Sequence, residues 1–518
     1  MDDLVGEAML VHELLQATAA RVPERLALIE GDETLTYAQL HARVERVAAG
    51  LERRGVGVGD RVALLLPNCI EFALAYFAVL RLGAIVVPLN TRLAPTECAY
   101  AINDCTAKLL ILDEAFRDAY EEFRESVHTL EGVIRVGDRH DDGESFNDVC
   151  SAKGEPRVSP DLTAADPACI MYTSGTTGSP KGAVMSHGNV VVNARNCGAH
   201  LNYNESDRTL IAVPLFHVTG LNSQLVAFCY TGGTCVLMRR YSTDAMIELI
   251  ERHGITVLFN VPTMYTLMLM SEVLDDRDTS SLRIAAYGGA PMDPQTIVDL
   301  RDRLALDLYN AYGLTETSSL TTVLPACDAV RKAGSVGLPV SGVCLRVFDE
   351  QDATLPAEAV GELAIKGPNV VSQYWNKPAA TDAALGDGWL RTGDCARIDA
   401  EGFVFIADRK KDMINRAGEN VYSIEVESVL LTYPRVLEAA VVPRAHSILG
   451  EVVHAFLVPT PGAHITEDEV IRHCDGEIAD FKIPASVSFV EQLPRNPGGK
   501  VLKTRLREMV PAGDPPRR

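Results

Sequence analysis

The sequence predicts an α/β protein, with a large N-terminal domain of parallel sheets sandwiched with helices and a small α+β domain at the C-terminus. Short Val/Ile/Leu runs alternate with helical stretches over most of the chain, and Gly or Pro closely follows several of these runs. Continuous apolar runs are typical of parallel strands that are covered on both faces. After residue 360 the segments become short and turn-rich, and a new set of elements begins beyond Asp408. This change predicts the second domain.

The N-terminal part begins with a well-marked helix. Thr36-x-x-Gln39 has the pattern of a capping box, and the apolar residues from Leu40 to Leu51 fall on one helical face before Gly55. Three buried strands are then expected, separated by helical stretches such as 71–82. They are 62–66, 85–88 and 109–112.

The alternation resumes after residue 166. Strands are expected at 210–213, 234–238, 256–260, 282–287 and 307–310. In open α/β sheets, ligands bind beyond the carboxyl ends of the strands. The loops Pro214–Gly220, Gly288–Pro291 and Tyr312–Glu316 follow three of these strands. We therefore expect the three loops to share one ligand.

The C-terminal hundred residues form a set of their own. Ser423 opens a helix over 424–431, and the runs 439–443 and 455–459 are expected to be strands. We place the domain boundary at Asp408, so the predicted domains are 1–408 and 409–518.

Charge and cysteine usage narrow the possible partners. The chain has 48 Lys and Arg residues and 70 Asp and Glu residues, which gives a net charge of −22. This negative charge disfavours duplex nucleic acid and anionic lipid as partners. The 12 cysteines include no C-x-x-C pair, and the first ten residues lack a positively charged leader segment, so we expect a reducing cytoplasm. The segment 209–238 has no charged residue, but Pro214 and Gly232-Gly233 interrupt it. We expect two buried strands and a helix there, not a membrane span.

The strongest local signal is the loop from Tyr172 to Gly182, which combines hydroxyl residues, three glycines and Lys181. Glycines let successive backbone N–H groups face an anion, and the lysine adds a mobile positive charge. The glycine spacing differs from that of a Walker A loop, which disfavours an ordinary P-loop phosphotransferase. We therefore predict a polyphosphate site; the alternative is a flexible surface loop.

Three further residue types suit a nucleotide and its metal ion. Glu316 offers the hard carboxylate oxygen that magnesium prefers, although it could equally cap a helix that starts near Thr315. Tyr312 offers a flat face for adenine, beside a small turn at Gly289. Asp394 is able to accept hydrogen bonds from both ribose hydroxyls. The plain alternatives are a core tyrosine and a turn aspartate.

The loop resembles the signature of the adenylate-forming superfamily, which includes acyl-CoA synthetases, luciferases and the adenylation domains of peptide synthetases. Five further segments resemble the later motifs of that family in the same order. They are Tyr309–Glu316, Gly361–Pro368, Trp389–Asp394, Asp408–Asp412 with Gly418 and Glu425, and Pro494–Lys500.

The resemblance implies a role for each matching residue. Lys500 and Glu316 are implied in catalysis, with His217 beside the acid, although a neutral histidine held by the backbone is an equal alternative for His217. Magnesium is implied at Thr177 and Glu316, and the hinge of the mobile domain at Lys411. The implied nucleotide-binding residues are Thr173, Ser174, Gly175, Thr176, Thr177, Gly178, Lys181, Gly289, Ala290, Tyr312, Gly313, Thr315, Asp394 and Arg409. The implied acid pocket comprises His217, Gln224, Met264, Met268, Gly289 and Ser318.

The expected activity is that of an ATP-dependent carboxylic acid–CoA ligase with Mg²⁺, ATP and CoA. It would form acyl-AMP and pyrophosphate, and then acyl-CoA and AMP. The Met-rich pocket favours a medium-to-long aliphatic or an aromatic acid. One alternative is a ligase that stops at acyl-AMP or passes the acyl group to a separate carrier protein. Another is a nucleotide-binding protein without turnover. The sequence leaves open whether the protein forms a homodimer.

Overall fold

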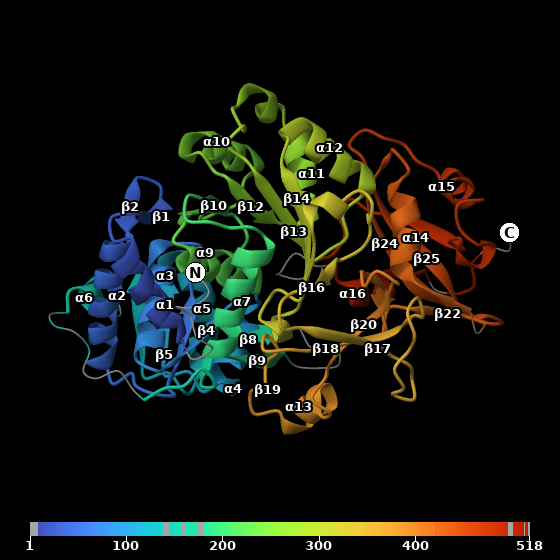
Figure 1. Ribbon diagram of the computed structural model, residues 1–518. Helices are drawn as coiled ribbons and strands as arrows, with labels where there is room; N and C mark the ends of the chain where they lie inside the picture. The colour runs from blue at the N-terminus through green and yellow to red at the C-terminus, as the bar shows by residue number, and fades with distance from the viewer. Residues whose placement is uncertain are drawn as a thin grey trace. The chain divides into compact units, whose positions relative to one another are not determined.

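The computed structural model describes residues 9–137, 144–152, 154, 156, 161–173, 180–417, 419–495, 501–511 and 513–515. The chain forms two compact units, each of which is described by itself (Figure 1). The first comprises Met1–Ala290, Thr296–Cys344 and Ile365–Leu390. The second comprises Pro291–Gln295, Leu345–Ala364 and Arg391–Arg518.

The first unit contains an eight-stranded sheet among its described residues. In spatial order its strands are β19 (Gln373–Tyr374), β9 (Lys181–Ser186), β8 (Pro167–Thr173), β4 (Ile85–Pro88), β3 (Arg61–Leu65), β5 (Leu109–Asp113), β6 (Gly132–Val136) and β7 (Glu144–Ser145). The strands from β4 to β7 pair in parallel. Val62, Ala63 and Leu64 of β3 are all fully buried, because both faces of this strand are covered.

A second, nine-stranded sheet lies in the described part of the same unit. Its order is β16 (Leu338–Pro339), β15 (Thr322–Leu324), β14 (Asp307–Tyr312), β13 (Ile284–Gly288), β12 (Val257–Asn260), β10 (Arg208–Ile211), β11 (Thr234–Leu237), β1 (Leu26–Glu30) and β2 (Glu33–Thr36). The run from β14 to β1 is parallel throughout.

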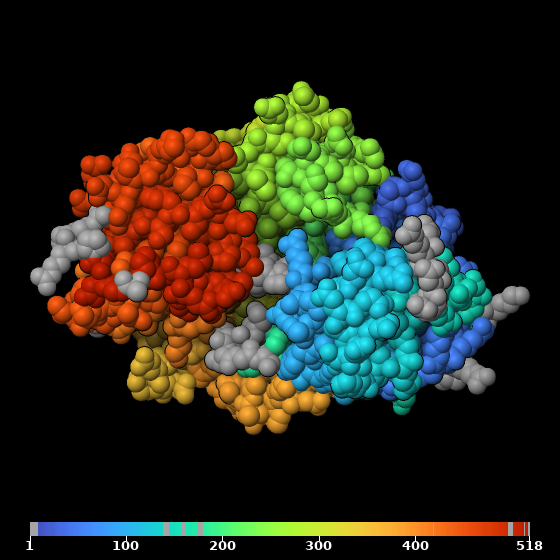
Figure 2. All heavy atoms as spheres, turned by 180° about the vertical axis from the view of Figure 1, so that it is seen from behind, coloured from blue at the N-terminus to red at the C-terminus, as the bar shows by residue number. Residues whose placement is uncertain are grey.

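Helices cover these sheets. They are α1 (Val11–Arg21), α2 (Tyr37–Glu52), α3 (Ile70–Arg81), α4 (Pro95–Asp104), α5 (Arg117–Phe123), α6 (Phe146–Cys150), α7 (His187–His200), α8 (Val218–Gly220), α9 (Ala227–Thr231), α10 (Thr243–His253), α11 (Pro262–Met270), α12 (Pro294–Leu304) and α13 (Pro378–Leu385). Helices α1, α2 and α3 pack side by side (Figure 1). The region that contains β5, α5 and β6, cyan in Figure 2, forms much of one exposed face of this unit.

Helix α2 forms for the reason that the sequence predicts. The Thr36 hydroxyl accepts a hydrogen bond from the Gln39 amide, and the Gln39 side chain accepts one from the Thr36 amide. The capping box thus satisfies two donors that a helix start leaves open. The buried face includes Leu40, Val44 and Leu51, as the 3.6-residue period requires.

The second unit contains two smaller sheets in its described residues. The four-stranded sheet has the order β17 (Cys344–Phe348), β18 (Gly361–Lys366), β20 (Leu390–Ile398) and β21 (Val404–Arg409). The five-stranded sheet is formed by β23 (Glu419–Val421), β22 (Ile414–Arg416), β25 (Gly450–Pro459), β24 (Val436–His446) and β26 (Ser486–Phe489). Its helices are α14 (Ser423–Leu431), α15 (Glu467–Cys474) and α16 (Lys503–Met509).

These findings confirm the predicted α/β class, with large parallel sheets in one part and a smaller α+β part. The uncharged segment 209–238 forms two buried strands, β10 and β11, with helical turns between them, as predicted. Within the described ranges, no helix has both the length and the apolar character needed to cross a bilayer.

Candidate functional site

The carboxyl ends of the parallel strands bring three predicted loops to one edge of the nine-stranded sheet. Strands β10, β12, β13 and β14 run in the same direction. His217 follows β10, Gly289 follows β13, and Tyr312 ends β14. The sequence therefore placed these loops at a common sheet edge, where α/β proteins gather their ligand contacts.

The backbone around Tyr312 requires glycine. A Cβ atom at Gly313 would lie 1.3 Å from the Ser319 carbonyl oxygen, so only glycine fits there. Gly289 is exposed and adopts a φ of +80°, which a side chain would disfavour. Tyr312 itself is half-buried. A tyrosine beside the closely packed turn at Gly313, with open space at Gly289, suits the binding of a flat ring.

The predicted phosphate loop connects two antiparallel strands, β8 and β9, in which Thr173 is paired with Lys181. The Thr173 hydroxyl lies 3.4 Å from the Lys181 carbonyl oxygen, to which it donates a hydrogen bond. Five of the predicted phosphate ligands lie outside the described residues. They are Ser174, Gly175, Thr176, Thr177 and Gly178. Both strands that carry the loop are nevertheless fixed by the sheet.

Lys181 and Glu316, predicted for phosphate and magnesium, both contact Tyr374. The Tyr374 hydroxyl donates a hydrogen bond of 2.8 Å to Oε1 of Glu316. The Lys181 Nζ lies 5.3 Å from the centroid of the Tyr374 ring. The motif analysis did not include Tyr374. The only signal was its place in the segment that follows the Gly361–Pro368 motif.

Glu316 lies in a 3₁₀ turn, Thr315–Thr317, that directly follows the Tyr312 loop. Glu316 does not cap this turn, because the hydrogen bond from the Leu314 amide is accepted by the Thr317 hydroxyl instead. The Glu316 carboxylate instead accepts from Tyr374, and its backbone carbonyl accepts from the Val371 amide at 2.9 Å. Thr315, predicted to contact the nucleotide, is half-buried in the same turn. The turn thus holds the carboxylate at the Tyr374 hydroxyl, and Lys181 lies over the ring of the same tyrosine.

The residues of the predicted acid pocket differ in their surroundings. Met264 and Met268 are buried on α11, with 8% and 0% exposure. The His217 ring is exposed, yet nearby protein atoms displace enough water to lower its pKa below 6.5. His217 is thus open to solvent, whereas Met264 and Met268 are buried in the fold.

Gln224 and Ser318 are buried completely. Gln224 lies in a short π-helix, Leu221–Val226, and its amide accepts from Thr209 and donates to the Phe259 carbonyl. The Gln224 amide is thus engaged within the fold. Ser318 adopts a φ of +56°, and its hydroxyl has no hydrogen-bond partner among the described residues. An unpaired buried hydroxyl beside the Glu316 turn is the more available of the two for a ligand.

The second unit carries the predicted ribose and hinge residues. Asp394 of β20 pairs with Arg409 of β21, and the Arg409 Nε lies 3.6 Å from an Asp394 oxygen. Lys411 is exposed just beyond β21, and its carbonyl accepts a hydrogen bond from Arg507 at 2.9 Å. Lys500, the predicted catalytic lysine, lies outside the described residues. Asp394 and Arg409, both predicted for the ribose, therefore form one local pair.

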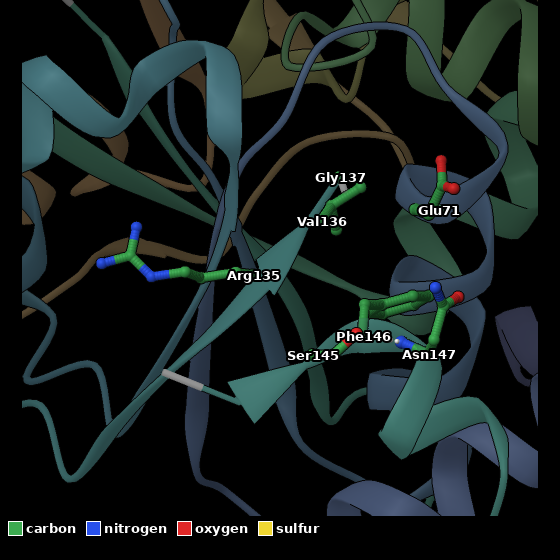
Figure 3. Close-up of a pocket in the computed structure, with 7 residues that line it drawn as sticks. All are labelled: Glu71, Arg135, Val136, Gly137, Ser145, Phe146 and Asn147. Atoms are coloured by element: carbon green, nitrogen blue, oxygen red, sulfur yellow. Dashed lines mark hydrogen bonds between the residues drawn. The ribbon is translucent and has the colours of Figure 1, made fainter. Parts of the chain in front are cut away.

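A separate cavity of about 110 Å³ lies near α3, β6 and α6, away from the motif residues. Figure 3 shows Glu71 on the far side of this cavity from the Arg135 side chain, which points away from it. Arg135 lies 3.7 Å from Glu114 and 3.8 Å from Glu121, so its charge is neutralised there. The cavity therefore lacks a converging set of charged groups and is not the candidate site.

Two family models match the chain. The AMP-binding enzyme model matches residues 15–375, and the AMP-binding enzyme C-terminal domain model matches residues 425–500. The chain is 37% identical to an indoleacetate–CoA ligase of Aromatoleum aromaticum, with 95% of each chain covered. It is 34% identical to a long-chain-fatty-acid–CoA ligase of Mycobacterium tuberculosis, with coverage of 97% and 99%.

Solved structures agree with this assignment. An anthranilate–CoA ligase in complex with anthranoyl-AMP has a TM-score of 0.92 and 28% identity, with 98% of each chain covered. An o-succinylbenzoate–CoA synthetase of Bacillus subtilis, solved with ATP and a magnesium ion, has a TM-score of 0.85 and 34% identity over 95% of this chain and 98% of its own. The family that the six motifs predicted is thus confirmed, and its relatives are ligases of aromatic and aliphatic acids with CoA. The chain belongs to the AMP-binding enzyme family.

Proposed function

We propose that this protein is an AMP-forming ligase that joins a hydrophobic carboxylic acid to CoA. The acid and ATP first give acyl-AMP and pyrophosphate, and the CoA thiol then displaces AMP to give the thioester. The observation that carries the proposal is the placement of Lys181 and Glu316 around Tyr374 beside the Tyr312 loop. One cation and one carboxylate share Tyr374, and the carboxylate lies in the turn after Tyr312, an arrangement that would suit Mg·ATP.

The first half-reaction brings two anions together, a carboxylate and the α-phosphate. Lys181 and the N–H groups of the 174–179 loop would offset this repulsion, and Lys500 would stabilise the transition state from the second unit. Tyr312 would stack on adenine beside Gly289, Ala290 and Gly313. Thr315 would lie at the phosphates, and Asp394 with Arg409 would hold the ribose.

The residues present fit a magnesium ion. Glu316 is half-exposed and uses Oε1 for Tyr374, and its Oε2 receives no hydrogen bond from any described residue. Magnesium is usually held by one or two carboxylates together with substrate phosphates, so a dedicated protein cluster is not needed. Glu316 would hold the ion with Thr177, and the ion would neutralise charge on the phosphates.

The two half-reactions require different arrangements of the same residues. We propose that 409–518 is a mobile domain that turns at Lys411 relative to 1–408 once the adenylate has formed.

The acid would lie against His217, Gly289 and Ser318, with Met264, Met268 and Gln224 behind them. The buried methionines favour an aromatic or a longer aliphatic acid over acetate. The twelve cysteines are all free thiols, which agrees with a cytoplasmic location.

A panel of acids tests this function. Arylacetic, hydroxycinnamic and fatty acids, with acetate as the short control, are incubated with Mg·ATP with and without CoA. Pyrophosphate release and mass spectrometry of the products are followed. We expect AMP, pyrophosphate and an acyl-CoA for at least one aromatic or longer acid. Accumulation of acyl-AMP in the presence of CoA would instead indicate a separate carrier protein as acceptor, and ADP as product would refute adenylation.

A further inference from the structure

Tyr374 owes its position to a very short strand at the edge of the eight-stranded sheet. Strand β19 pairs antiparallel with β9, so that Tyr374 lies opposite Ala183. The next amide, that of Trp375, donates to the Gly182 carbonyl at 2.7 Å. These bonds fix the tyrosine next to the first residue of β9, which is Lys181. The backbone, and not the side chain alone, sets this distance.

The same segment also holds Glu316. The Val371 amide donates to the Glu316 carbonyl at 2.9 Å, three residues before Tyr374. The tyrosine hydroxyl then donates to the Glu316 carboxylate at 2.8 Å. The Tyr374 hydroxyl is the donor of this hydrogen bond, because an ionised carboxylate can only accept. Tyr374 is 8% exposed and Glu316 is half-exposed, so this hydrogen bond is partly buried.

Lys181 and Glu316 carry opposite charges, yet they form no ion pair with each other. The ammonium group lies over the tyrosine face instead, and the carboxylate lies at the tyrosine hydroxyl. A cation over a desolvated ring is held by the negative face of the ring. A direct Lys–Glu pair would neutralise both groups and reduce their attraction for phosphate and for magnesium. The tyrosine therefore keeps both charges separate and available.

We propose that Tyr374 is a positioning residue that holds Lys181 and Glu316 apart for Mg·ATP. This inference rests on the proposed function. The hydroxyl would position Glu316 and thereby affect how strongly ATP binding responds to magnesium. The ring would position Lys181 and thereby affect the binding of the β- and γ-phosphates. The two halves of one side chain thus have separable effects.

The test uses two substitutions of the full-length protein and one control. Tyr374→Phe keeps the ring and removes the hydroxyl, whereas Tyr374→Leu removes both. Tyr37→Phe is the matched control, because Tyr37 is also a buried tyrosine of the first unit and donates to the Phe228 and Gly233 carbonyls. Calorimetry measures the binding of ATP with magnesium, of ATP with a chelator, and of AMP, all without acid.

For Tyr374→Phe we expect the gain in ATP affinity that magnesium provides to fall by about tenfold, since a hydrogen bond to a charged group is lost. ATP binding in chelator and AMP binding should stay unchanged. Tyr374→Leu should also weaken ATP in chelator by several-fold, but not AMP, which lacks the outer phosphates. The control should match the wild type for all three ligands.

Three outcomes would overturn the inference. One is an unchanged magnesium response in Tyr374→Phe. Another is an equal loss of AMP and ATP binding together with a lower melting temperature, which would indicate a structural role only. The third is a wild-type protein whose ATP binding does not respond to magnesium. Failure of the proposed function alone is distinguishable, because the wild type would then bind Mg·ATP but yield no acyl-AMP with any acid of the panel.

Discussion

Acid should destabilise the first unit through a buried histidine, His187. This residue is the first of α7 and is fully buried, and its Nδ1 accepts a hydrogen bond from the Val11 amide at 3.2 Å. Burial lowers its pKa from 6.5 to about 4. Since Nδ1 is an acceptor, the imidazole is neutral, and a second proton would have to displace the Val11 amide. Protonation of the His187 imidazole is therefore less favourable in the folded chain than in the unfolded chain.

The sign and size of the effect follow from linkage. The unfolded chain binds the proton below pH 6.5, and the folded chain binds it only near pH 4. The contribution of neutral His187 to the free energy of unfolding is therefore fully present above pH 6.5 and is lost as the pH falls towards 4. At pH 5 the loss from this one histidine is about 2 kcal/mol. His12, whose ring centroid lies 6.3 Å away and whose pKa is lowered by burial to about 3, adds a loss of similar sign.

The assay is urea unfolding at pH 7.5 and pH 5, followed by the fluorescence of Trp375 and Trp389, the two tryptophans of the chain, both in the first unit. His187→Gln keeps a polar acceptor that does not titrate. Independently of the effect of the substitution at pH 7.5, the free energy of unfolding of the variant should fall by about 2 kcal/mol less between pH 7.5 and pH 5 than that of the wild type. His128→Gln, at an exposed position, is the control and should follow the wild type. Parallel curves for wild type and His187→Gln would refute the reasoning.

Three further predictions concern the proposed reaction and the second unit. Lys500→Ala should nearly abolish acid-dependent pyrophosphate release and spare thiolation of supplied acyl-AMP, because its charge serves only the first transition state; equal loss of both half-reactions would contradict this role. Lys411→Pro should spare adenylation and impair thiolation, since proline restricts the backbone rotation at that residue; an unchanged rate of CoA-ester formation would count against the hinge. Asp408→Ala should destabilise the second unit by about 3 kcal/mol in thermal unfolding, because Asp408 is 1% exposed and accepts hydrogen bonds from the Ser423 amide, the Ser423 hydroxyl and the Arg409 amide. Asp475→Ala, at an exposed position, is its control and should have little effect.

Much of the first unit could be predicted because its strands are buried on both faces. The run Ile85–Pro88 matches β4 residue for residue, since four buried apolar residues between polar stretches have few other places in an α/β fold. The loop after β14 was found in the same way, because the end of a parallel strand marks the edge where ligands bind. Local pattern and tertiary position agree at these places.

The contact between Glu316 and Tyr374 could not be predicted from the sequence. Strand β19 has two residues, too few for any periodic signal, and it pairs with β9 across almost two hundred residues of sequence. The second unit posed a similar problem, because its four-stranded sheet joins β17 and β18 to strands that come after α13. Pairings of this kind depend on the completed fold and not on local preference.

The basic run at the end of β21 shows what the structure adds to the motif. From the sequence, Arg409, Lys410 and Lys411 are three equivalent surface cations. In the fold, Arg409 pairs with Asp394 and Lys410 lies 3.3 Å from Glu362, so both are held by the four-stranded sheet. Lys411 is the second residue after Arg409, with which β21 ends, and its carbonyl accepts a hydrogen bond from Arg507 of α16 instead. A change of backbone angle at Lys411 would leave Arg409 and Lys410 in place, so Lys411, the first residue beyond these two cations, suits the proposed hinge.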